Sequence, residues 1–140
     1  MSKFIIVGGV AGGATTAARL RRLNETAEII LIERGSEISF ANCGLPYYVG
    51  DVIKDRDDLL AMTPQRFFNL FNIDVRINSE VIKVDSKNKT VLVKNSDGEY
   101  EENFDALVLS PGAKPLRPPI EGIDHKNILT LRNVPDADRI

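Results

Sequence analysis

The chain has 140 residues, of which 43% are hydrophobic and 27% charged, a mixture typical of a globular protein and not of a disordered chain. Its 18 Lys and Arg residues against 20 Asp and Glu residues give a net charge of -2, so no basic excess is available to bind nucleic acid. No apolar run approaches the ~18 residues of a membrane span, and residues 4–7 are too short for a signal peptide core. We therefore expect about one domain, with no nucleic-acid or membrane partner.

The chain contains a single cysteine, Cys43, and a single histidine, His125. One thiol cannot close an internal disulfide, which excludes a disulfide-stapled secreted scaffold and favours a reducing, cytoplasmic location. A lone cysteine far in sequence from the only histidine also cannot form a cysteine zinc site. We therefore expect no metal.

The N-terminal part of the chain predicts a β-α-β unit. Residues 3–8 and 28–33 each contain an unbroken apolar run, which is typical of parallel strands covered on both faces. Residues 14–23 predict the helix between them. The helix residues expected to face the sheet are Ala14, Ala17, Ala18, Leu20 and Leu23. Such a unit predicts an α/β fold with a right-handed crossover.

The middle of the chain predicts an antiparallel meander inserted into the parallel sheet. Residues 36–50 are expected to form a loop, and residues 64–71 a short helix that Thr63 caps and Pro64 begins. Apolar runs and turn signals predict the strands that follow. These are residues 75–85, 90–95 and 100–104, joined by turns at 86–89 and 96–98, and then a buried strand at residues 106–110.

The last part of the chain is rich in proline, with 5 of the 7 prolines at or after position 111. Residues 113–122 therefore predict a stiff, extended connector. Residues 128–131 predict a short strand, and Asn133 is expected to cap a helix with Pro135 in its first turn. The chain stops at Ile140, before that helix reaches the usual length of ~11 residues. We therefore expect a fragment of a larger protein.

A glycine-rich turn, residues 8–13 (GGVAGG), lies between the first strand and the first helix. Gly8 permits a tight turn and Gly13 the close packing of the helix, whereas Val10 replaces the middle glycine of the dinucleotide fingerprint. Glu33, 20 residues after Gly13, can accept hydrogen bonds from a ribose diol, and the helix N-terminus can bind a pyrophosphate. The pattern predicts dinucleotide binding but does not distinguish FAD from NAD. The alternative is that the glycines serve only βα packing.

The segment that contains Cys43 follows the second strand, where the carboxyl ends of a Rossmann-type sheet bind cofactors. We therefore expect the thiol to approach the redox end of a bound dinucleotide, above the glycine turn. The alternative is an inert buried cysteine, which the polar and glycine neighbours Asn42 and Gly44 disfavour.

The sequences IVGGVAGGATTAARLRRL, ISFANCGLPYYVG and LSPGAKPLRPPIEG resemble the coenzyme A-disulfide reductase family. This is the single-cysteine branch of the FAD-dependent pyridine nucleotide-disulfide oxidoreductases. The resemblance implies an α/β, Rossmann-like FAD/NAD(P)-binding domain of three layers, incomplete at the C-terminus. Residues 1–112 would be the first segment of the FAD-binding domain, and residues 113–140 the connector to an NAD(P)-binding domain. It also implies a homodimer that uses NAD(P)H to reduce a small-molecule disulfide or persulfide.

The resemblance further implies roles for individual residues. Cys43 would be the redox nucleophile that forms a mixed disulfide with coenzyme A, and Val81 would touch the adenine of FAD through its backbone. The positions expected to bind FAD are Gly8, Val10, Ala11, Gly13, Glu33, Arg34, Asn42, Val81, Ser110, Pro111 and Gly112. The positions expected to bind coenzyme A are Thr15, Arg19, Arg22, Ser39 and Asn42.

Helix geometry supports part of this assignment independently. Thr15, Arg19 and Arg22 lie at i, i+4 and i+7 and form one stripe, whose guanidinium groups can bind phosphates. The alternative is an ordinary solvated face. Phe71 stands where the family often carries a basic residue.

Two further functions remain open. One is an NADH oxidase of the same superfamily, although Ala11 stands where such enzymes carry a histidine. The other is a nucleotide-binding module without turnover, in which the chain alone binds FAD weakly at best. The missing second thiol excludes two-cysteine enzymes such as glutathione reductase.

Overall fold

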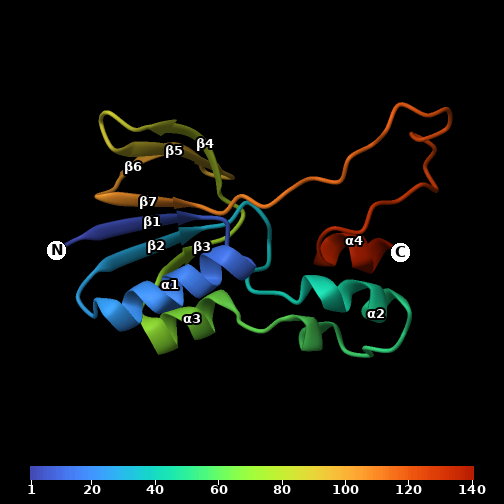
Figure 1. Ribbon diagram of the computed structural model, residues 1–140, viewed down its shortest axis with the longest axis horizontal. Coiled ribbons are helices and arrows are strands. Elements are labelled where there is room, and N and C mark those ends of the chain that lie inside the picture. The colour runs from blue at the N-terminus through green and yellow to red at the C-terminus, as the bar shows by residue number, and fades with distance from the viewer. The chain divides into compact units, whose positions relative to one another are not determined.

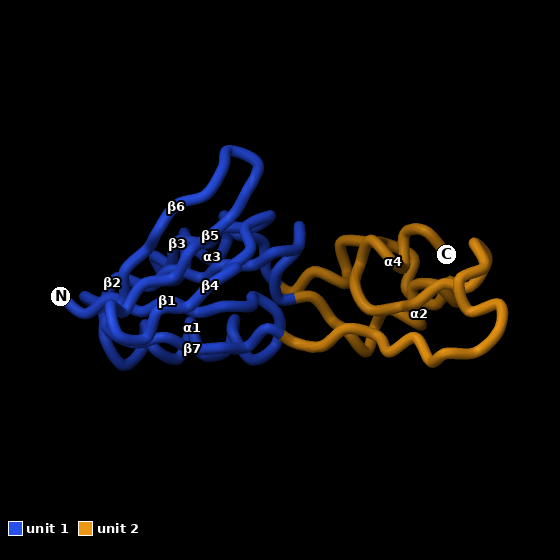
Figure 2. Tube along the Cα trace, turned by 90° about the horizontal axis from the view of Figure 1, so that it is seen from above, with its two compact units in different colours: residues 1–39, 62–111 blue, residues 40–61, 112–140 orange.

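The computed structural model describes all 140 residues, and the chain divides into two compact units (Figure 2). Unit 1 contains residues 1–39 and 62–111, and unit 2 contains residues 40–61 and 112–140. Unit 2 thus combines the cysteine segment with the C-terminal part of the chain. No helix is long and apolar enough to cross a membrane.

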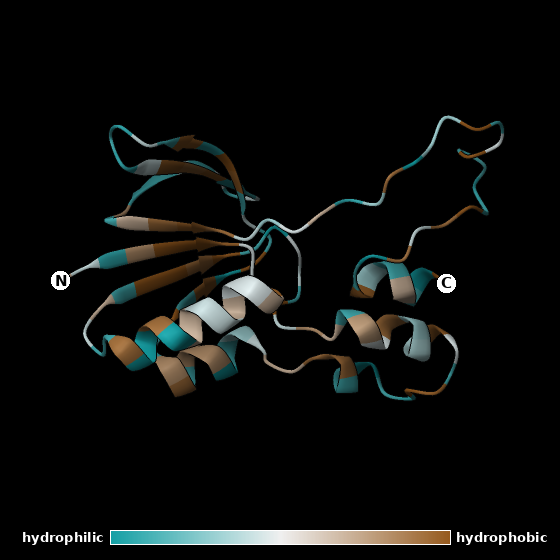
Figure 3. Cartoon of the chain, viewed as in Figure 1, coloured by the Kyte–Doolittle hydropathy of each residue, from teal (hydrophilic) through white to brown (hydrophobic).

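Unit 1 is built on a parallel sheet whose strands lie in the order β3-β2-β1-β7. They are β1 (Lys3–Val7), β2 (Glu28–Ile32), β3 (Asp74–Arg76) and β7 (Ala106–Leu109). Ile5, Ile6 and Leu31 are fully buried, because both faces of the sheet are covered. Figure 3 shows the resulting run of apolar residues along these strands. The predicted parallel sheet is confirmed, but the prediction that residues 106–110 form a buried strand is wrong. β7 lies at the edge of the sheet, and its residues Ala106 and Leu109 are exposed.

Helices α1 (Ala11–Leu23) and α3 (Pro64–Phe71) cover one face of this sheet (Figure 1). Ala14 and Ala17 are buried against the sheet as predicted, but Leu23 is 67% exposed, so its predicted burial is wrong. At 3.6 residues per turn Leu23 lies about 120° around the helix from Ala17. The helix also begins three residues earlier than predicted, because the glycines at its start are helical.

The ends of the two helices are fixed by side chains. As predicted, Thr63 caps α3: its Oγ1 accepts a hydrogen bond from the N–H of Arg66 at 3.3 Å, and Pro64 begins the helix. Arg21, near the end of α1, donates hydrogen bonds to five backbone carbonyls. These belong to Asn24, Glu25, Ala27, Phe71 and Asn72. One guanidinium group thus ties the end of α1 to the end of α3.

A three-stranded antiparallel meander covers the other face of the sheet, which completes the three predicted layers (Figure 1). Its strands are β4 (Glu80–Asp85), β5 (Thr90–Asn95) and β6 (Gly98–Asn103). Val91 and Val93 pack on Ile5, Ile30 and Ile32 of the sheet. The predicted turn at residues 86–89 is confirmed.

The single strand predicted over residues 75–85 is wrong. Asp74–Arg76 is β3 of the parallel sheet, whereas Glu80–Asp85 is β4 of the meander. The chain changes sheet at Asn78, which has a positive φ of 50°, and at Ser79, whose N–H donates to the carbonyl of Glu33 at 3.0 Å. The apolar pattern runs through both strands, so only the pairing separates them.

Unit 2 contains the short 3-10 helices η1 (Asn42–Gly44) and η2 (Arg56–Leu59) and the helices α2 (Leu45–Val49) and α4 (Val134–Arg139). The prediction of a loop over residues 36–50 is wrong in its second half, because η1 and α2 are helical. These short helices pack around a small core, whose buried members are Leu45, Leu59, Val134 and Ala137.

The C-terminal part of unit 2 confirms one prediction and contradicts another. Asn133 caps α4 by accepting a hydrogen bond from the N–H of Asp136 at 2.9 Å, with Pro135 in the first turn. Residues 128–131 form no strand, because no neighbouring strand pairs with them. Residues 113–122 contain no helix or strand, which agrees with a connector.

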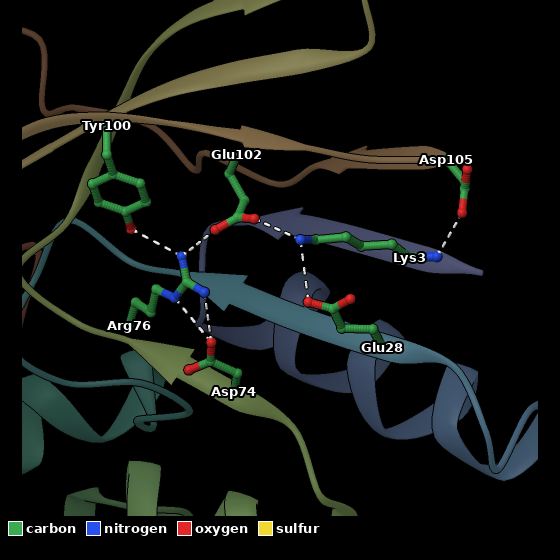
Figure 4. A network of polar contacts seen from close by, with 7 residues as sticks. All are labelled: Lys3, Glu28, Asp74, Arg76, Tyr100, Glu102 and Asp105. Carbon is green, nitrogen blue, oxygen red and sulfur yellow. Dashed lines mark hydrogen bonds and ion pairs between the residues drawn. The ribbon is translucent and has the colours of Figure 1, made fainter. Parts of the chain in front are cut away.

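A polar network joins the parallel sheet to the meander in unit 1 (Figure 4). The carboxylate of Glu102 on β6 accepts hydrogen bonds from Lys3 Nζ of β1 at 2.5 Å and from Arg76 Nη1 of β3 at 2.6 Å. Lys3 also pairs with Glu28 at 3.1 Å. Partial burial by itself would raise the pKa of Glu102, but the hydrogen bonds from Lys3 and Arg76 outweigh it and lower that pKa below its ordinary value.

We expect Glu102→Gln to lower the free energy of unfolding at neutral pH by about 1.5–3 kcal/mol, since two cations lose a charged acceptor. The pKa of Glu102 in the folded state lies below 4.5. The carboxylate therefore stabilises the fold above about pH 4.5, and this contribution is lost as the pH falls through the folded-state pKa. Urea unfolding at about pH 7 and about pH 3.5 measures the change.

The matched control is Glu101→Gln, which alters an exposed carboxylate on the same strand that has no partner in the chain. The control should leave stability within about 0.5 kcal/mol of wild type. An equal loss for Glu102→Gln at both pH values would contradict the charged role of the network.

Candidate functional site

The glycine turn between β1 and α1 brings the helix N-terminus to the carboxyl end of the sheet. Gly8 has a φ of +96°, and a β-carbon there would lie 2.0 Å from the carbonyl oxygen of Ser110. A β-carbon on Gly13 would lie 1.7 Å from the carbonyl oxygen of Gly8. Val10 precedes α1, no side chain caps the helix, and its first turn contains no acidic residue. This N-terminus therefore fits an anionic group such as a pyrophosphate.

Glu33 follows β2 and lies directly beside the turn. Its Oε2 accepts a hydrogen bond from the N–H of Gly9 and its Oε1 one from the N–H of Gly35, both at 2.7 Å. These bonds fix the orientation of the carboxylate. Each oxygen keeps a further lone pair, so the group can still accept hydrogen bonds from ribose hydroxyls.

A hollow beside Glu33, called here the glycine-turn hollow, brings together five of the residues predicted to bind the cofactor. These are Gly8, Glu33, Arg34, Val81 and Pro111. Val7, Ile32, Ser79 and Glu80 complete its lining. The sequence analysis missed Ser79 and Glu80, although both directly precede Val81. Ser110, at the end of β7, bonds through its N–H to Val7 and faces Gly12.

A second hollow, called here the α1–α3 hollow, has a volume of about 290 Å³, close to the lower end for small-molecule sites. It brings together Thr15, Arg22 and Ser39, three of the residues predicted to bind coenzyme A. Its other lining residues are Val10, Ala11, Ala14, Ala18, Met62, Phe67 and Phe71. Arg19 is exposed on α1 and does not line it.

The α1–α3 hollow has features that the sequence analysis did not identify. Met62, Phe67 and Phe71 give it an apolar wall from the α3 side. Ser39 has a positive φ of 49° and donates its N–H to the carbonyl of Gly9 at 2.8 Å. One wall of this hollow is therefore joined directly to the glycine turn.

Three predicted residues belong to unit 2. Asn42 and Cys43 lie in η1, and both are exposed. The thiol of Cys43 is free, so the alternative of an inert buried cysteine is wrong. Gly112 has a positive φ of 70°, and Arg132 lies beside it and donates to the carbonyl of Ala113 at 3.0 Å. No group of three or more His, Cys, Asp or Glu side chains in the chain is arranged to hold a metal.

Comparison with known proteins agrees with this geometry. The family described as pyridine nucleotide-disulphide oxidoreductase matches residues 2–140. The chain belongs to this family. Its members depend on FAD and NAD(P)H, and the uncapped helix N-terminus and fixed Glu33 carboxylate fit the nucleotide part of such a cofactor.

Curated relatives of this oxidoreductase chain include the coenzyme A disulfide reductase of Staphylococcus epidermidis, 46% identical over 143 residues, which cover all of this chain and 32% of that protein. The Staphylococcus aureus enzyme of the same name is 42% identical over 142 residues, with the same coverage. These relatives confirm the resemblance to the coenzyme A-disulfide reductase family. The chain spans about a third of their length.

Solved structures of the family are also similar to this chain. The reduced CoADR-RHD protein of Bacillus anthracis is 56% identical with a TM-score of 0.95, over 99% of this chain and 26% of that one. An NAD-dependent persulfide reductase from A. fulgidus is 37% identical with a TM-score of 0.94, over 98% and 26%. The water-forming NADH oxidase of Lactobacillus brevis is 28% identical with a TM-score of 0.92, over 99% and 31%.

We expect Gly13→Ala to lower the free energy of unfolding by about 3 kcal/mol or more, because the new β-carbon would overlap the carbonyl of Gly8. Gly12→Ala is the matched control. Its β-carbon would meet Ser110 Oγ at 3.3 Å, and alanine favours a helix over glycine by about 1 kcal/mol. Thermal unfolding compares the two variants, and equal losses would contradict the proposed close approach.

Proposed function

We propose that the protein containing this chain is a flavoprotein that uses NAD(P)H and FAD to reduce coenzyme A disulfide or a related persulfide. Residues 1–112 would supply the first segment of its FAD-binding domain, and residues 113–140 the connector to its NAD(P)-binding domain. The observation that carries the proposal is the glycine-turn hollow, which five predicted cofactor-binding residues line, in a chain whose only thiol is exposed and free.

The chain's own groups suit the adenosine diphosphate half of FAD. The N-terminus of α1 would bind the pyrophosphate, with Val10, Ala11 and Gly13 in or beside the first turn. Glu33 would bind the ribose, and Arg34 and the backbone of Val81 would contact the adenosine from the same hollow. Further contacts are proposed from Asn42, Ser110, Pro111 and Gly112.

FAD, when bound, would transfer the two electrons of NAD(P)H to a disulfide. Cys43 would act as the nucleophile: its thiolate attacks one sulfur of the substrate disulfide, breaks the S–S bond and forms a mixed disulfide. The other sulfur leaves as a thiolate, which takes a proton from solvent. Two electrons and a proton then release the second thiol and restore the thiolate. The exposed, free thiol of Cys43 supports this role.

The α1–α3 hollow suits the coenzyme A part of the substrate. Arg22 would pair with a phosphate, while Thr15 and Ser39 would donate hydrogen bonds from the same hollow. Arg19 and Asn42 are proposed as additional contacts. Names of relatives support this substrate class, since they include coenzyme A disulfide reductases and a persulfide reductase.

A second candidate is an NADH oxidase, favoured by the similarity to the Lactobacillus brevis oxidase. Ala11 argues against it, because a methyl group supplies no proton for the chemistry of oxygen or peroxide. Oxygen uptake compared with thiol release by the full-length protein separates the two.

We also propose that the full-length protein is a cytoplasmic homodimer.

In the full-length protein we expect Cys43→Ser to slow NAD(P)H-dependent reduction of coenzyme A disulfide roughly a thousandfold or more, because a serine hydroxyl does not attack a disulfide sulfur. Reduction of a small quinone, which needs no thiol, should persist and serves as the internal control. The absorbance of NAD(P)H follows both reactions. Undiminished disulfide reduction by the variant would contradict the role of Cys43.

We expect Arg22→Ala in the full-length protein to raise the KM for coenzyme A disulfide about tenfold or more with little change in kcat, since it removes a charged hydrogen bond made equally before and during reaction. Lys87→Ala, which removes an exposed cation from the turn between β4 and β5, is the matched control for net charge. Equal KM values for the two variants would count against the proposed phosphate contact.

A further inference from the structure

One carboxylate on α4 contacts two of the helices next to the cysteine segment in unit 2. The Oδ2 of Asp138 accepts a hydrogen bond from Nε of Arg56 on η2 at 3.0 Å, and its Oδ1 lies 3.3 Å from the same nitrogen. The hydroxyl of Tyr48 on α2 donates a longer hydrogen bond to that Oδ1, at 3.5 Å. A single side chain thus joins α4 to both α2 and η2.

The segment that carries Cys43 is anchored on η2 at two points. The N–H of Ala41 donates to the carbonyl of Leu59 at 2.8 Å. Gly44 is buried, and a β-carbon on it would lie 3.0 Å from the side chain of Leu59. Leu59 therefore contacts the chain on both sides of the cysteine, so a shift of η2 would displace Cys43.

The position of η2 depends in turn on α4. Side chains three residues apart lie on the same side of a 3-10 helix, as Arg56 and Leu59 do. Leu59 is fully buried in a core with Val134 and Ala137 of α4, while Arg56 pairs with Asp138. Apolar packing has no preferred direction and allows the two helices to slide, whereas a hydrogen-bonded ion pair favours one alignment. The ion pair therefore fixes how η2 lies along α4.

We propose that Asp138 is a positioning residue for Cys43: through Arg56 it fixes η2, and through η2 it orients the thiol for attack on the substrate disulfide. The proposal rests on the proposed function, in which Cys43 is the nucleophile. The two side chains of the ion pair are 36% and 35% exposed, so water partly replaces a lost partner. We therefore expect a loss of about tenfold, below the roughly hundredfold that a displacement of about 1 Å can cause.

Asp138→Ala in the full-length protein tests this role. It should lower kcat for NAD(P)H-dependent reduction of coenzyme A disulfide about tenfold and leave KM within about twofold of wild type. KM should change little because all residues that line the α1–α3 hollow belong to unit 1. Reduction of a small quinone, which needs no thiol, should keep its wild-type rate. An equal fall in both reactions would show a general loss of folded enzyme and overturn the positioning role.

Arg56→Ala tests the ion pair from its other side. Because Asp138 is proposed to act through Arg56, kcat of the double variant should lie within about twofold of the slower single variant. Losses that multiply in the double variant would overturn the proposal. Asp58→Ala is the matched control, since it removes an exposed carboxylate of η2 that has no partner in the chain. It should leave kcat unchanged.

The outcomes separate this proposal from the one on which it rests. A wild-type kcat in Asp138→Ala would overturn the positioning role and leave the proposed function standing. Undiminished disulfide reduction by Cys43→Ser would overturn both.

Discussion

Gly13, in the first turn of α1, lies so close to the carbonyl group of Gly8 that a β-carbon on it would come within 1.7 Å of the oxygen. The approach sets where α1 begins and directs its N-terminus at the carboxyl end of the sheet. In the same turn, the carbonyl of Gly9 accepts a hydrogen bond from the N–H of Ser39, and the N–H of Gly9 donates one to the carboxylate of Glu33. Both hollows of unit 1 therefore take part of their lining from residues that this contact positions.

The sheet transmits that geometry because both of its faces are closed. On one face Ala14 and Ala17 let α1 approach closely, and on the other Val91 and Val93 seal Ile5 and Ile30. The ion pairs around Glu102 lie at the junction of sheet and meander, where burial of an unpaired carboxylate would be unfavourable. Because these contacts hold the meander against the sheet, the start of β4 is fixed beside Glu33, whose carbonyl accepts a hydrogen bond from the N–H of Ser79.

The two hollows of unit 1 differ in chemistry. The glycine-turn hollow contains three charged residues, Glu33, Arg34 and Glu80. The α1–α3 hollow has an apolar wall from α3 and a single cation, Arg22. In the proposed function the first suits a nucleotide, and the second suits a long thiol substrate with an apolar arm and a phosphate. The glycine turn borders both hollows, since Gly8 lines the first and Val10 and Ala11 line the second.

The sequence by itself determined the features that depend on neighbouring residues: the glycine turn, the apolar strands β1 and β2, the caps Thr63 and Asn133, and the cysteine segment that carries the family resemblance. Only the tertiary structure decided which strands pair, so it separated β3 from β4 and left residues 128–131 without a strand. It also decided that Leu23 is exposed and that Glu80 lies in the same hollow as Glu33. The physical reason is that periodicity and capping act within a few residues, whereas pairing and burial depend on partners that only the folded chain brings together.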